Sequence, residues 1–120
     1  MALELPQRNA AFLWIGAAGH AMLGLWGIGS SVNSMQLHIA FAVALEDLLG
    51  APARLREQGV VPLSFFGRET SEPDVLGWMP AGAVYFRDPD GHLLEYLAML
   101  DEAPRSDAGV VPWSEWTPQV

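Results

Sequence analysis

The sequence predicts an α+β domain built on a strand–helix–strand–strand–strand (βαβββ) module over residues 37–100. Three observations support this fold class. An apolar strand is predicted at 37–43, a helix with an apolar stripe at 45–58, and a β-hairpin around a tight turn at 83–99. Residues 2–26 add three short strands, so we expect an incomplete first module before the complete one.

The incomplete module is predicted from short apolar runs. Residues 2–6 form a strand closed by proline, and residues 10–15 and 21–26 form two strands joined by a glycine-rich turn. Residues 27–34 are polar and contain glycine, which is typical of a linker. Both modules therefore end in an apolar hairpin.

The strand at 37–43 alternates between large and small residues. Side chains of a strand alternate between its two faces, so the large ones are expected to pack on a helix. The small face carries His38 between alanines and is expected to line a hollow. The large residues are Leu37, Ile39, Phe41 and Val43, and the small face holds His38, Ala40 and Ala42.

The helix at 45–58 is predicted from leucines at helical spacing, and Gly59 suits the position after its end. Pro52 leaves two alternatives open. Either the regular helix starts near Leu49, with Pro52 in its first turn, or the helix bends at Pro52.

The remaining segments are predicted from composition. Residues 60–66 are expected to form a strand, and residues 67–80 a long loop. Residues 101–120 are rich in Pro, Asp and Ser, so we predict an extended C-terminal arm after a single domain at 1–100. Its two tryptophans, Trp113 and Trp116, are expected to dock on the body or on a partner subunit.

The hairpin turn contains the most informative residues. Asp88 can accept hydrogen bonds from the turn backbone, Pro89 presets φ, and Gly91 closes the turn. Glu95 lies in the apolar run after the turn, where an unpaired charge is costly. It is expected to have a partner or to face a cavity, and the alternative is an edge-strand glutamate that faces water.

Composition excludes several classes of function. The net charge is −8, every basic residue apart from histidine is Arg, and this balance opposes binding to nucleic acid or to anionic lipid. Cys is absent, which excludes disulfides, thiolate metal sites and cysteine nucleophiles. The N-terminus does not resemble a signal peptide, and no apolar run is long enough to cross a membrane, so a cytoplasmic location is expected.

The hairpin sequence from Val84 to Tyr96 and the strand His-Ile-Ala-Phe-Ala-Val at 38–43 together resemble the vicinal oxygen chelate superfamily. This superfamily groups glyoxalase, bleomycin-resistance and extradiol dioxygenase proteins. The resemblance runs from about residue 2 to residue 100. It implies that two βαβββ modules curve a mixed sheet into a cup that takes a small molecule.

The resemblance also implies a divalent metal, Zn, Mn, Ni or Fe, held by side chains from strands of both modules. The family positions of two ligands match His38 and Glu95. The third ligand usually comes from an opening strand that is absent here, and the alternative family position corresponds to Gly24, which cannot ligate. Another reading of His38 is a buried histidine whose ring nitrogens are satisfied by neighbours.

Aromatic residues are candidates for the wall of the pocket. We predict Trp14, Trp26, Trp78 and Phe86 for this role, although core packing explains each of them individually. The missing opening strand and helix would leave the strand at 21–26 as an unpaired edge and uncover part of an apolar sheet face, so a homodimer or larger assembly is predicted. A start codon placed downstream of the native one explains the sequence equally well.

Three hypotheses about function remain open. The first is a metal-dependent lyase, isomerase or dioxygenase, in which no general base is identifiable. The second is a metal-free binding protein for a cationic, drug-like molecule, which the negative charge and the five Trp residues suit. The third is a truncated family member without activity.

Overall fold

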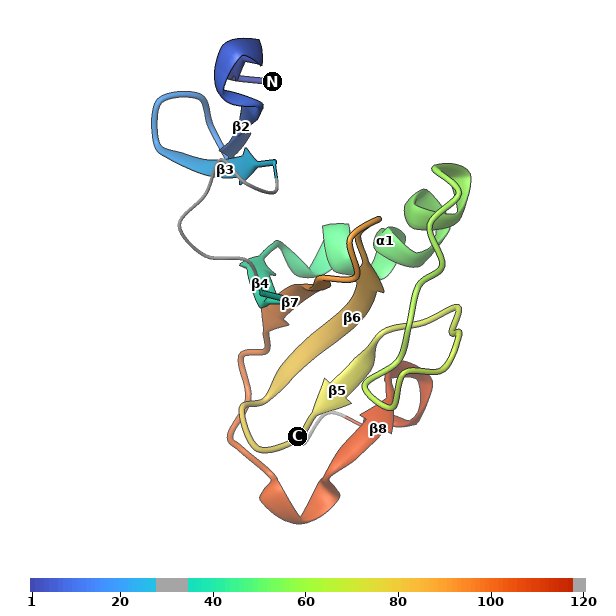
Figure 1. Cartoon of the computed structure of the whole chain (residues 1–120). Helices are drawn as coiled ribbons and strands as arrows, with labels where there is room; N and C mark the ends of the chain where they lie inside the picture. Colours follow the sequence, from blue (N-terminus) through green and yellow to red (C-terminus); the bar gives the residue numbers. More distant parts are fainter. Residues whose placement is uncertain (28–34, 118–120) are drawn as a thin grey trace. The chain divides into compact units, whose positions relative to one another are not determined.

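The computed structural model describes residues 1–27 and 35–117, and the chain divides into two compact units, Met1–Met35 and Gln36–Val120 (Figure 1). The predicted α+β class is confirmed. The described residues form one α-helix and two sheets, of three and five strands. Residues 28–34 of the predicted linker lie outside the described residues.

The first unit is an antiparallel sheet in the order β1-β2-β3. Its strands are β1 (Leu3–Leu5), β2 (Ala10–Ile15) and β3 (Ala21–Trp26). Trp14 pairs with Met22 and Ala10 with Trp26, so apolar side chains of both strands share one face. Within the described residues β3 pairs only with β2 and forms an edge of this sheet, as the sequence predicted.

The second unit is a mixed sheet in the order β4-β7-β6-β5-β8, with β4 and β7 parallel and the other pairs antiparallel. One face of the sheet is covered by helix α1, which contacts β6 and β7 (Figure 1). The elements are β4 (His38–Ala42), α1 (Leu45–Glu57), β5 (Asp74–Leu76), β6 (Ala81–Arg87), β7 (Leu93–Met99) and β8 (Val110–Pro112).

Helix α1 buries its leucine stripe against the sheet. Leu48 is fully buried and packs with Val84 of β6 and Ala98 of β7. The helix begins at Leu45, so the alternative of a start near Leu49 is wrong, and Pro52 lies in the helix interior. Gly59 follows the helix with φ of 75° and donates its N–H to the carbonyl of Arg56, as predicted for this position.

The predicted strand at 60–66 is wrong, and the third strand of the module is β5 instead. Only Leu63 of this segment pairs with β6, through two backbone hydrogen bonds with Tyr85. Pro62 has no N–H to donate, and the chain turns after Leu63. Asp74–Leu76, placed in a loop by sequence reasoning, is short but pairs with β6 on one side and β8 on the other.

The C-terminal segment adds to the sheet. Val110–Pro112 forms β8 against β5, and Trp116 is buried. Trp116 donates its indole N–H to Glu102 at 3.1 Å, and the Arg105 guanidinium lies 3.6 Å from the ring centroid. Trp116 therefore docks on its own chain, which is one of the two alternatives predicted for the tail tryptophans. The division into a domain at 1–100 and an arm at 101–120 stays a prediction.

Among residues 1–27 and 35–117, no helix has the length and apolar character needed to cross a membrane.

Candidate functional site

The face of the second sheet opposite helix α1 brings three polar residues together. Strand alternation places Tyr85 of β6 and Glu95 of β7 on this face, and the two residues are directly paired across the strands. The parallel register aligns Ala40 of β4 with Glu95, so His38, two residues earlier, also reaches this face. The site is thus positioned by three neighbouring strands.

His38 and Glu95 are in direct contact. The Nε2 atom of His38 donates a hydrogen bond to Oε1 of Glu95 at 2.8 Å. The side chain of Glu95 is 7% exposed, whereas that of His38 is 53% exposed. The imidazole therefore satisfies the buried carboxylate that sequence reasoning singled out, and it presents its remaining edge to solvent.

Tyr85 and Asp74 are buried near this pair. Burial raises the pKa of the Tyr85 phenol, and the charges of Glu95 and Asp74 and a hydrogen bond to Glu95 raise it further. The phenol therefore remains protonated at neutral pH. Burial also raises the pKa of Asp74, against the lowering effect of the Phe65 backbone N–H, which donates to its Oδ2 at 2.8 Å.

A cavity of about 350 Å³ lies beside the His38–Glu95 pair. Strands β4, β6 and β7 form one side of it, and the loop around residues 63–67 forms the other. The lining residues are His38, Leu63, Ser64, Phe65, Phe66, Gly67, Tyr85, Arg87 and Leu93.

Comparison with known protein families identifies the fold. The model of the Glyoxalase/Bleomycin resistance protein/Dioxygenase superfamily matches residues 3–96. The chain belongs to this superfamily. Members of the glyoxalase superfamily generally bind small molecules, often use metal ions and often form dimers. The family resemblance predicted from the hairpin and the His38 strand is confirmed.

A solved structure supports the glyoxalase fold. The chain is similar to an integron cassette protein from the mobile metagenome of Halifax Harbour Sewage Outfall, with a TM-score of 0.63 and 31% sequence identity. The match covers 81% of this chain and 74% of that one. The chain also matches the oxidase ChaP-H2 at 28% identity over 57% of this chain and 54% of that one, with a TM-score of 0.44.

The side chains of His38 and Glu95 fit part of a glyoxalase-type metal centre. Imidazole nitrogen and carboxylate oxygen suit Zn, Ni, Fe and Mn. With metal–ligand distances of about 2.0–2.2 Å, two ligands of one such ion lie about 3–3.5 Å apart, so the 2.8 Å hydrogen bond between Nε2 and Oε1 would widen slightly for both atoms to bind one ion. Among the described residues, however, no third His, Asp or Glu joins them, so this pair alone leaves the ligand set incomplete.

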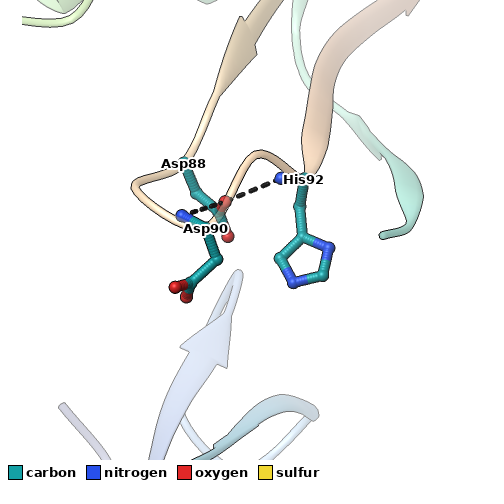
Figure 2. A group of neighbouring side chains, drawn as sticks. All are labelled: Asp88, Asp90 and His92. Carbon is teal, nitrogen blue, oxygen red and sulfur yellow. Dashed lines mark hydrogen bonds between the residues drawn. The ribbon is translucent and has the colours of Figure 1, made fainter. Parts of the chain in front are cut away.

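A different group, Asp88, Asp90 and His92, has ligand atoms within 4.8 Å of one another (Figure 2). Two of these residues already have structural roles. Asp88 Oδ1 accepts the backbone N–H groups of Asp90 and His92, as predicted for a turn aspartate. His92 Nδ1 accepts the N–H of Leu37 at 2.9 Å, which fixes the chain just before β4. These contacts explain the cluster as part of the turn.

Of the predicted pocket residues in the second unit, neither Trp78 nor Phe86 lines this cavity. Trp14 and Trp26 belong to the first unit. The ring centroid of Trp78 lies 6.0 Å from that of Phe65, which is a lining residue. Phe86 lies on the helix side of β6 because it alternates with Tyr85, and its ring is 5.0 Å from that of Tyr96. Their assignment to a substrate pocket stays a prediction.

Sequence reasoning missed Tyr85, Arg87 and the aromatic loop residues of the cavity. Strand alternation offered a signal for the first two, because both share the face of Glu95 in the paired strands. No comparable signal exists for Phe65 and Phe66. Their loop is held by a hydrogen bond from the Phe65 N–H to Asp74, a contact between separate segments.

Proposed function

We propose that this protein binds a small organic molecule in the cavity between the sheet and the 63–67 loop. The observation that carries the proposal is the position of His38, which contacts the buried carboxylate of Glu95 and also lines the cavity. The polar pair of His38 and Glu95, beside a largely apolar cavity, can orient a bound ligand.

The size and walls of the cavity support this function. Its volume of about 350 Å³ falls at the lower end of the range of about 300–1,000 Å³ for small-molecule sites. Phe65 and Phe66 are 44% and 69% exposed, respectively. Large aromatic side chains left open to solvent beside a hollow offer contact area that is still uncovered.

We expect Leu93→Trp, which fills the cavity, to abolish binding of planar aromatic fragments. The measurement is ¹⁵N NMR titration with 2-naphthoate, 2-naphthamide and 2-naphthamidine, in which at least one probe should shift the amides of residues 63–67 and 85–87. Met99→Trp adds the same side chain at an exposed position of β7 and should leave binding unchanged.

Phe66→Ala provides a second test, since this exposed side chain can be removed without disturbing the core. It should weaken the same titrations. Shifts confined to other surfaces, or no shifts with any of the three probes, would contradict the proposed function.

We propose as a second candidate that His38 and Glu95 hold one divalent metal ion beside the cavity. The support is the matching donor pair described above. Such an ion would act as a Lewis acid on oxygen atoms of the ligand, as lyase, isomerase or dioxygenase chemistry of this superfamily requires. Among the described residues this pair supplies two ligands, and water, the small molecule or another chain could supply the others. The homodimer stays a prediction.

Zn²⁺ titration by calorimetry tests the metal. We expect one ion per chain, with affinity reduced at least about tenfold in His38→Ala and in Glu95→Ala because each removes one of two protein ligands. Asp90→Ala is the control, since it removes a carboxylate of the turn cluster. Zn²⁺ binding that is insensitive to His38 and Glu95 but lost in Asp90→Ala would contradict the assignment.

A further inference from the structure

We infer that the molecule bound in this cavity is a planar aromatic anion whose carboxylate meets Arg87. This inference rests on the proposed function and adds the chemical class of the ligand. The negative net charge of the chain suggests a cationic ligand. The lining of the cavity suggests an anionic ligand instead, because it contains Arg87 and no Asp or Glu.

The charged group that lines the cavity is basic. Arg87 is among the lining residues, and no Asp or Glu is. Two carboxylates that contact lining residues are already engaged, Glu95 by His38 and Asp74 by the backbone N–H of Phe65. A cationic ligand would therefore meet an arginine without finding a free carboxylate on the wall.

The guanidinium of Arg87 retains hydrogen-bonding capacity. Its Nη1 donates to the carbonyl of Gly91 at 3.0 Å. The ion pairs of residues 1–27 and 35–117 involve His38, Arg56 and Arg105, and none joins Arg87 to a carboxylate within 4.0 Å. A guanidinium has five N–H donors in a planar fork, so several remain for an oxyanion.

The net charge of −8 does not oppose this arrangement. Exposed charges more than about 8–10 Å away are largely screened at physiological ionic strength. The local cation at Arg87 therefore determines which ligand charge the cavity prefers, and the distributed acidic surface mainly slows the approach of an anion.

The opposite wall favours a flat ring. Phe65 lies edge to face with both Phe66 and Tyr85, at centroid distances of 5.3 and 6.2 Å. These rings are held at steep angles to one another and offer faces and edges to a planar guest. An aromatic carboxylate places its ring here and its charge at Arg87.

Binding of four probes tests the inference by calorimetry: 2-naphthoate, the neutral 2-naphthamide, the cationic 2-naphthamidine and the non-aromatic decalin-2-carboxylate. We expect 2-naphthoate to bind at least about tenfold more tightly than each of the others, as a charge-assisted bidentate contact and aromatic packing predict. Arg87→Gln should remove the preference over 2-naphthamide, and Arg87→Lys should retain part of it.

Arg68→Gln is the matched control because it removes the same charge from the neighbouring loop, outside the cavity lining. It should change 2-naphthoate affinity less than about twofold. Phe65→Leu and Phe66→Leu should reduce the preference over decalin-2-carboxylate. Tight binding of 2-naphthamidine in the cavity would overturn the ligand class while leaving the proposed function intact, whereas no binding by any probe would overturn both.

Discussion

Leu48→Ala is expected to lower the free energy of unfolding by about 2–5 kcal/mol, the range for removing a buried leucine side chain. Leu48 is fully buried between helix α1 and the sheet, where it contacts Ala51, Val84 and Ala98. Denaturant unfolding followed by circular dichroism measures the change. Leu49→Ala removes the same atoms from the next, exposed position and should cost much less.

A double variant tests this packing more sharply. A Cβ added at Gly82 would lie 2.7 Å from Cδ2 of Leu48, so Gly82→Ala alone should also destabilise the protein. Leu48→Ala vacates that space, and the double variant should lose less stability than the sum of the two single variants. Strict additivity would show that Leu48 and Gly82 do not pack against each other.

Trp116→Ala is expected to destabilise the C-terminal segment by about 3–5 kcal/mol, as removal of a buried tryptophan does. The indole is buried, donates to Glu102 and stacks with Arg105, whose Nη2 also donates to the carbonyl of Thr117. Its loss should release β8 (Val110–Pro112) from β5, which hydrogen exchange at these amides measures.

Two further variants separate the contributions of Trp116. Trp116→Phe keeps an aromatic ring and loses the N–H donor to Glu102, so a smaller loss of about 1 kcal/mol is expected. Trp78→Ala removes a tryptophan that is 44% exposed and should leave exchange in β8 unchanged. Unchanged β8 protection in Trp116→Ala would contradict the proposed role of the indole.

Local patterns were sufficient to predict much of the second unit. The alternation at 37–43 correctly separated the face of His38 from the face that packs on α1, since Val43 joins the core around Leu48. The odd carboxylate at Glu95 in an apolar strand correctly indicated a partner. The first inference worked because burial of one strand face imposes a period of two on the sequence, and the second because an unpaired buried charge is costly.

Other features depend on contacts between distant segments and escaped prediction. Strand β5 has three residues and is defined by its pairing with β6 and β8. The apolar run at 60–66 has the composition of a strand but contains Pro62 and pairs only at Leu63. The aromatic wall of the cavity depends in the same way on the hydrogen bond between Phe65 and Asp74.

The most direct test of the account is ¹⁵N NMR of the His38 imidazole with and without 2-naphthoate. We expect Nε2 to carry the proton donated to Glu95, and we expect both Glu95→Gln and filling of the cavity to shift this resonance. An imidazole resonance whose chemical shift changes neither in Glu95→Gln nor on addition of 2-naphthoate would contradict the placement of His38 between the buried carboxylate and the cavity.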